Sequence, residues 1–109
     1  MTNALNIYRN TREIEVTYTT KDGYEVNLTV WNVDEGTSWV FAYGAIWDMT
    51  KEEPTRLYDV LTNSIRHSSP YRALVNGLFS LRRQVSKHTD TDIYNLLCDL
   101  RKQLREELH

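Results

Sequence analysis

The sequence predicts an α+β fold, in which a three-stranded antiparallel sheet is followed by three α-helices packed on one face. Two observations carry this prediction. Apolar and polar side chains alternate with a period of two in residues 1–48, and apolar side chains recur at helical spacing in residues 50–109. Runs of strands followed by runs of helices are typical of α+β domains. A length of 109 residues suits a single domain, 1–109, with the sheet in its first part and the helices in its second.

The segment from Arg12 to Asn32 is predicted to form the first two strands, because apolar residues alternate with polar ones on both sides of a turn. A two-residue loop of Asp22 and Gly23 would place apolar residues opposite polar ones. A loop over 21–23, with Gly23 in the left-handed region of a bulge, instead pairs Tyr18 with Val26. The predicted core face of this hairpin consists of Ile14, Val16, Tyr18, Val26, Leu28 and Val30.

The third strand is predicted from about Trp39 to Trp47, after a turn centred on Glu35 that places Trp31 opposite Trp39. This strand has two different faces. Its core face of smaller residues, which would let a helix approach closely, contains Val40, Ala42, Gly44 and Ile46, and its aromatic face contains Trp39, Phe41, Tyr43 and Trp47. A fourth strand through Leu5 and Ile7 is an alternative that the pattern leaves open.

Three helices are predicted after Trp47. Thr50 and Glu53 match a capping box before an apolar stripe, which predicts a first helix of about fifteen residues. Ser69 and Pro70 match the N-cap and the first position of a second helix, and a third helix runs from a cap near 89–91 to the C-terminus. The three apolar stripes are Leu57, Tyr58, Leu61 and Ile65; then Tyr71, Leu74, Val75, Leu78, Leu81 and Val85; then Ile93, Leu96, Leu97, Leu100, Leu104 and Leu108.

The sequence contains no motif for catalysis, a cofactor or a metal. Its four glycines match no dinucleotide or phosphate loop, and its three histidines have no second ligand at helical spacing. Glu15 and Glu25 on adjacent strands could form a carboxylate pair, but nothing near them offers a nucleophile or an oxyanion site. We therefore expect no enzymatic activity, no cofactor and no metal. No apolar run is long enough to span a membrane and no secretory signal is visible, which predicts a cytoplasmic protein.

The sheet face without helices is the predicted partner-binding surface. Large aromatic side chains among acidic and small polar groups are typical of protein interfaces. The alternative is that the protein's own structure, or a second copy in a homodimer, covers these aromatic rings. The predicted surface consists of Glu13, Glu15, Glu25, Trp31, Trp39, Phe41, Tyr43 and Trp47.

The chain is therefore expected to act as a small protein-binding module. A short chain without catalytic motifs suits a stoichiometric inhibitor that occludes a larger nucleic-acid-handling enzyme, as phage anti-CRISPR and anti-restriction proteins do. The expected partner is another protein, such as a basic nuclease or a nucleoprotein complex, and a phage protein of this kind would act in the bacterial cytoplasm. Acidic groups would steer the partner, and aromatic anchors would slow its dissociation.

A nucleic-acid-binding regulator is the alternative function, with direct nucleic-acid binding ranked below protein binding. Basic side chains in the last two predicted helices could contact phosphates, and the break between these helices suggests a helix-turn-helix. Asp90, Asp92 and Asp99 lie among the basic residues, and the helix dipole alone favours cations late in a helix. The basic residues of this alternative site are Arg72, Arg82, Arg83, Lys87, Arg101, Lys102 and Arg105.

Overall fold

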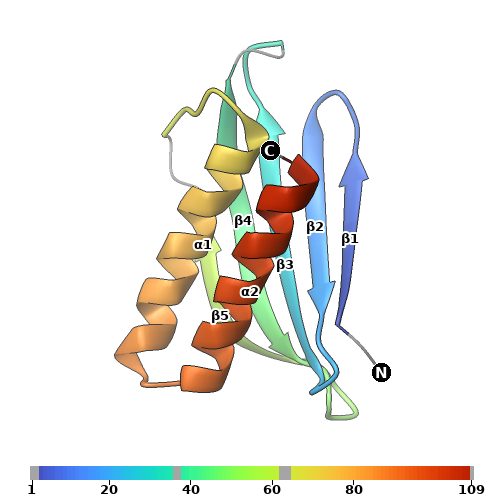
Figure 1. Ribbon diagram of the computed structural model, residues 1–109, viewed down its shortest axis with the longest axis vertical. Helices are drawn as coiled ribbons and strands as arrows, with labels where there is room; N and C mark the ends of the chain where they lie inside the picture. Colours follow the sequence, from blue (N-terminus) through green and yellow to red (C-terminus); the bar gives the residue numbers. More distant parts are fainter. Residues whose placement is uncertain (1–2, 36–37, 62–64, 109) are drawn as a thin grey trace.

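The computed structural model describes residues 3–35, 38–61 and 65–108 of the chain. Within these residues, a five-stranded antiparallel sheet in the order β1-β2-β3-β4-β5 is followed by two helices. Both helices lie side by side on one face of the sheet (Figure 1). The elements are β1 Ala4–Arg9, β2 Glu13–Thr19, β3 Tyr24–Asn32, β4 Trp39–Asp48, β5 Thr55–Leu61, α1 Pro70–Lys87 and α2 Thr91–Leu108. The fold is α+β, but the prediction of three or four strands and three helices is wrong.

The first hairpin has the predicted register. Tyr18 pairs with Val26, and the remaining apolar residues of β2 and β3 face each other as expected. Gly23 has a φ of 91°, which is the left-handed region that the predicted turn requires. The open alternative of an additional strand through Leu5 and Ile7 is also present, as β1, which pairs antiparallel with β2.

The first predicted helix, after Thr50, is instead the edge strand β5. Thr50 does not cap a helix, because its backbone N–H and its hydroxyl both donate to the Asp48 carboxylate, at 2.9 and 2.6 Å. β4 is buried along most of its length, so its second edge requires a hydrogen-bonded neighbour. β5 supplies this neighbour, and it turns Tyr58 and Val60 towards the core. Residues 55–61 therefore form a strand rather than a helix because they satisfy the backbone groups at the second edge of β4.

The register between β3 and β4 differs from the predicted one. Trp31 pairs with Val40 rather than with Trp39, and a bulge leaves Ala42 without a partner on β3. An extra residue in one strand reverses which face the following side chains occupy. Phe41 and Gly44 therefore both point towards the helices, and Phe41 is fully buried. The predicted alternation of β4 is right from Tyr43 onwards and wrong before the bulge.

Both later helices form at the predicted positions. The Ser69 hydroxyl accepts a hydrogen bond from the Arg72 backbone N–H at 3.2 Å, and Pro70 occupies the first turn of α1. At α2, the Asp90 carboxylate accepts from the Ile93 backbone N–H at 3.3 Å. Their apolar stripes join the sheet in one hydrophobic core. Neither helix in the described part of the chain is long and apolar enough to cross a membrane.

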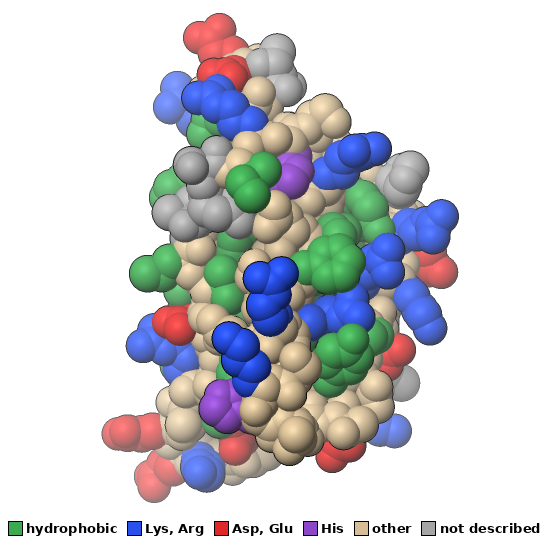
Figure 2. All heavy atoms as spheres, turned by 90° about the vertical axis from the view of Figure 1, so that its left-hand side faces the viewer, with side chains coloured by type: hydrophobic (Ala, Val, Ile, Leu, Met, Phe, Trp, Pro, Cys, Tyr) green, Lys and Arg blue, Asp and Glu red, His purple; other side chains and the backbone are tan. Residues whose placement is uncertain are grey.

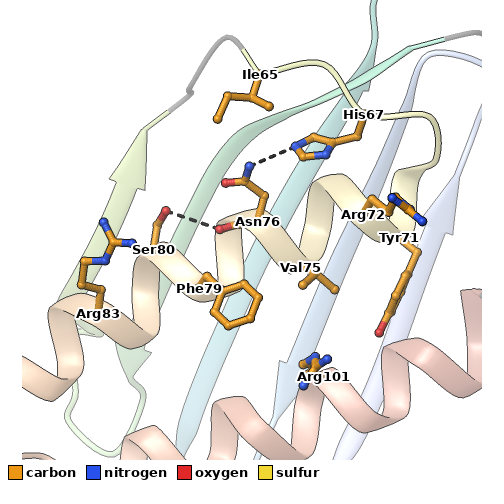
Figure 3. Close-up of a pocket in the computed structure, with 10 residues that line it drawn as sticks. All are labelled: Ile65, His67, Tyr71, Arg72, Val75, Asn76, Phe79, Ser80, Arg83 and Arg101. Atoms are coloured by element: carbon orange, nitrogen blue, oxygen red, sulfur yellow. Dashed lines mark hydrogen bonds between the residues drawn. The ribbon is translucent and has the colours of Figure 1, made fainter.

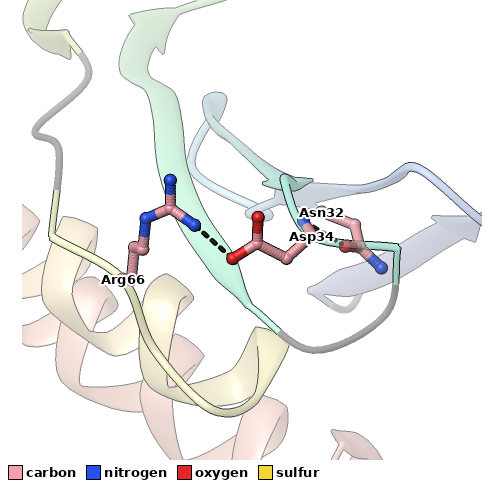
Figure 4. A network of polar contacts seen from close by, with 3 residues as sticks. All are labelled: Asn32, Asp34 and Arg66. Atoms are coloured by element: carbon pink, nitrogen blue, oxygen red, sulfur yellow. Dashed lines mark hydrogen bonds and ion pairs between the residues drawn. The ribbon is translucent and has the colours of Figure 1, made fainter.

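The segment before α1 is fixed to the sheet by backbone and side-chain contacts. Trp39 and His67 exchange backbone hydrogen bonds of 2.9 and 2.8 Å. Arg66 forms an ion pair with Asp34, beyond the end of β3, and this contact lowers the pKa of the Asp34 carboxyl (Figure 4). The Asn32 side chain in turn accepts from the Asp34 backbone N–H at 3.2 Å. These contacts hold His67 and its neighbours beside the outer surface of α1.

Candidate functional site

The face of the sheet opposite the helices is the first candidate site, and we call it the open sheet face. In the described chain both helices lie on the other side of the sheet (Figure 1). Cross-strand pairing fixes which side chains share this face. One row contains Tyr8, Glu15, Thr29, Tyr43 and Leu61; a second contains Asn6, Thr17, Asn27, Ala45 and Asp59; a third contains Ala4, Thr19, Glu25, Trp47 and Arg56; a fourth contains Glu13, Trp31 and Val40.

Exposed apolar groups are spread over the open sheet face. The exposed fractions of these residues are 58% for Tyr8, 48% for Trp31 and 70% for Leu61. On β4, Tyr43 lies in the same row as Tyr8 and Leu61, Trp47 lies in the row of Arg56, and both are half-buried. Tryptophan and tyrosine are frequent anchors of protein interfaces. The open sheet face therefore has the anchors that a protein interface needs.

Carboxylates outnumber cations in the paired rows of the open sheet face. Glu13, Glu15, Glu25 and Asp59 belong to it, whereas Arg56 is the cation of the described rows. Arg56 is engaged within the face, at 3.7 Å from the Asp59 carboxylate and 5.9 Å from the centre of the Trp47 ring system. A hydrogen bond with Tyr43 raises the pKa of this guanidinium above its ordinary value. The remaining carboxylates give the face a net negative charge.

Six of the eight residues of the predicted surface lie on the open sheet face, and two do not. The six are Glu13, Glu15, Glu25, Trp31, Tyr43 and Trp47. Phe41 lies in the hydrophobic core, and Trp39 packs against that core from the same side. The bulge at Ala42 is the cause, because it rotates the start of β4 towards the helices.

Both edge strands contribute residues to this face that the sequence pattern did not predict. Tyr8 and Leu61 are its two most exposed large apolar residues, and they come from β1 and β5. Tyr8 had a local signal, because it alternates with Leu5 and Ile7. Leu61 had no such signal, since it was placed on the stripe of a predicted helix.

A groove along α1 is the second candidate site, and we call it the α1 groove (Figure 3). It has a volume of about 630 Å³ and is open to solvent. Ile65 and His67 form one side, Arg101 of α2 lies on the other, and α1 provides the floor between them. The lining residues are Ile65, His67, Tyr71, Arg72, Val75, Asn76, Phe79, Ser80, Arg83 and Arg101.

Several polar contacts order the floor of the α1 groove. Asn76 Nδ2 lies 3.0 Å from His67 Nε2, which connects the floor to the segment before α1. Ser80 donates to the Asn76 backbone carbonyl at 3.4 Å. Phe79 lies outside the buried stripe of α1, and this residue, which lines the groove, is 49% exposed. This position of Phe79 was a signal in the sequence, because a ring on the solvent side of a helix has no packing role.

The basic residues that the sequence predicted to bind nucleic acid fall into two groups, those at the α1 groove and those away from it. Arg72, Arg83 and Arg101 line the α1 groove, and Arg82 lies beside it with its guanidinium 2.7 Å from the Tyr94 hydroxyl. The other cations, which do not line it, are Lys87, Lys102 and Arg105. The two helices lie side by side (Figure 1), whereas the helices of a helix-turn-helix cross at about 90–120°. The suggestion of a helix-turn-helix is therefore wrong.

No metal site is evident among the described residues, where no group of three His, Cys, Asp or Glu side chains lies close enough to hold an ion. The comparisons with known proteins add no relative: no protein family, no curated protein and no solved structure matches the chain. The function must consequently be inferred from the geometry and chemistry of the two candidate sites.

Proposed function

We propose that the protein binds a basic surface of another protein through the open sheet face. One observation carries this proposal: exposed aromatic and aliphatic anchors stand among carboxylates on a face that neither described helix covers. Tryptophan and tyrosine supply a large share of the binding energy at protein interfaces. Carboxylates around them favour a positively charged partner and accelerate its association.

The dimensions of the open sheet face suit such an interface. Five strands spaced at about 4.8 Å span roughly 24 Å, and seven residues at about 3.3 Å each span roughly 23 Å. The flat footprint is thus about 550 Å² before the relief of the side chains is added. One side of a standard protein interface buries about 800 Å². Because backbone hydrogen bonds already fix the strands, binding need not order this backbone.

We further propose that binding inhibits the partner. A domain of this size placed over a basic groove would exclude the nucleic acid that the groove normally binds. A stoichiometric inhibitor of a nuclease or of a nucleoprotein complex, as used by phages against bacterial defence, would act in this way. The acidic charge of the open sheet face supports this form of the proposal, because the target groove must be basic.

The proposal is tested by capturing partners with the tagged protein from the cells that produce it and identifying them by mass spectrometry. Trp31→Ala and Glu15→Lys change exposed side chains of the open sheet face, and Lys102→Glu is the control on α2. Thermal melting verifies that all three variants are folded. We expect a basic partner that binds the wild type and the Lys102→Glu variant and is lost in the other two.

Two results would contradict the proposal. A partner that survives both Trp31→Ala and Glu15→Lys binds elsewhere on the molecule. A wild-type dimer that Trp31→Ala converts to a monomer in analytical ultracentrifugation would show that a second copy covers the open sheet face.

A further inference from the structure

The outer side of α1 carries positive charge without an acidic neighbour in the same helix. α1 contains Arg72, Arg82, Arg83 and Lys87, and no Asp or Glu among its 18 residues. The helix dipole favours the cations near the C-terminus, but it disfavours Arg72 in the first turn. Figure 2 shows this side of the molecule, where Lys and Arg side chains gather around hydrophobic ones and acidic side chains lie mainly towards the edges. The helix dipole therefore explains the positions of only some of these cations.

The arginines of the α1 groove are spread along α1 rather than clustered at one point. Arg72 and Arg83 are eleven positions apart, which corresponds to about 16 Å along a helix. Arg101 approaches the groove from α2, between these two positions as seen along α1 (Figure 3). The spacing of these three arginines suits a ligand with charges repeated along its length.

Aromatic rings and guanidinium planes lie against each other beside these charges. The Arg82 guanidinium lies 5.2 Å from the ring centre of Phe79 and 4.9 Å from that of Tyr94. The Arg101 guanidinium lies 5.9 Å from the Phe79 ring centre. Exposed rings and guanidinium planes are the surfaces on which unpaired bases stack. Half of the Phe79 side chain remains accessible for this purpose.

We propose that the α1 groove binds single-stranded nucleic acid, with phosphates at Arg72, Arg83 and Arg101 and a base against Phe79. A duplex would require an element that projects into its major groove. Here α1 is instead the floor of a concave surface, with Ile65 and Arg101 on either side of it. An acidic polypeptide could supply the charges, but its carboxylates provide no flat ring for Phe79.

The acidic open sheet face does not oppose this binding. It lies on the far side of the sheet from α1 (Figure 1), beyond a helix about 10 Å in diameter. At physiological ionic strength, charges are screened over about 8 Å. The two sites therefore act on their ligands separately, and this inference does not depend on the function proposed for the open sheet face.

The test is fluorescence anisotropy of the purified 109-residue chain with labelled oligouridylate and oligothymidylate of about twenty nucleotides, a length that exceeds the usual site of one small binding domain. A duplex of the same length and a polyglutamate peptide serve as comparison ligands. We expect a dissociation constant of about 1–100 μM at physiological salt for the single strands, and tighter binding at lower salt. Three phosphate contacts predict that the logarithm of the affinity falls by about two units per tenfold rise in salt.

Variants locate the binding. Arg72→Ala and Arg83→Ala should each reduce the salt slope by about 0.7, whereas Lys102→Ala, which removes an exposed cation outside the groove, should leave it unchanged. Phe79→Leu should weaken binding at least about fivefold, because it preserves apolar volume but removes the ring. Phe79→Tyr should retain the affinity.

Several outcomes would overturn the inference. Absence of binding at about 100 μM protein would do so, and so would an equal loss in Lys102→Ala and Arg83→Ala, which would indicate diffuse charge. Tighter binding of the duplex or of polyglutamate would assign the α1 groove to another class of ligand. Full affinity of Phe79→Leu would remove the base-stacking site.

Discussion

Gly77→Ala tests the closest contact between the helices and the sheet. A Cβ atom at position 77 would lie 2.0 Å from Cε1 of Phe41, where an ordinary carbon contact needs about 3.5 Å. The Phe41 ring has little freedom to move, because it is fully buried and its Cζ also packs against Gly44. Overpacking of this kind costs up to about 3 kcal/mol. Better helix propensity returns about 1 kcal/mol, so we expect a net loss of about 2 kcal/mol.

Urea denaturation measures this loss, and thermal melting should show a decrease of about 9 °C in the midpoint. Phe41→Leu provides the matched background, because it removes the ring that the new methyl group at position 77 would strike. In that background Gly77→Ala should be neutral or stabilising by up to about 1 kcal/mol. An unchanged stability of the single variant, or an equal loss in both backgrounds, would refute the position of Phe41 beneath α1.

Three further predictions concern the turn and the edge strand. Gly23→Ala should destabilise the protein by about 1–2 kcal/mol in urea denaturation, because the φ of residue 23 is 91° and the new Cβ would lie 2.3 Å from Cγ2 of Thr50. Unchanged stability would contradict this turn conformation. Tyr58→Ala should cost about 2 kcal/mol and Leu61→Ala less than about 0.5 kcal/mol, whereas equal losses would favour the helical stripe. The hydrogen bond from the Thr50 hydroxyl lowers the pKa of the Asp48 carboxyl. The ionised Asp48 carboxylate therefore stabilises the fold above about pH 4, and this stabilisation is lost as the pH falls through the folded-state pKa. Thr50→Val should raise that pKa in an NMR titration and flatten the acid dependence of stability, and an unchanged Asp48 titration would contradict this.

The first hairpin and the last two helices could be predicted because their signals are local. Gly23 provides a turn that only one register satisfies, and Ser69 followed by Pro70 marks the start of α1. In each case the residues that decide the structure are neighbours in the sequence.

β5 and the bulge could not be predicted in this way, because distant contacts decide both. Leu57, Tyr58 and Leu61 fit either a helix or a strand, and the hydrogen-bonding edge of β4 selects the strand. The bulge turns Phe41 to the side where Gly77 leaves space for its ring. No pattern within β4 contains that information.

The open sheet face could be predicted in part from local patterns, whereas the α1 groove could not. Glu13, Glu15, Glu25 and three aromatic residues of the open sheet face followed from the alternation of β2, β3 and the second part of β4, whereas Asp59 of β5 did not. The α1 groove did not, because the contacts that place Ile65 and His67 beside α1 join residues far apart in the sequence: Arg66 with Asp34, and His67 with Trp39 and Asn76. The arginines were recognised in the sequence, but the wall that makes their surface concave was not.

Oxidative footprinting of the captured complex, after nuclease treatment, tests the central claim most directly. Trp31, Tyr8 and Phe79 are all exposed in the free protein and should be oxidised there. The proposed function predicts that the partner protects Trp31 and Tyr8 while Phe79 is still oxidised at its free rate. Oxidation of Trp31 at its free rate in the complex, with or without protection of Phe79, would show that the open sheet face is not where the partner binds.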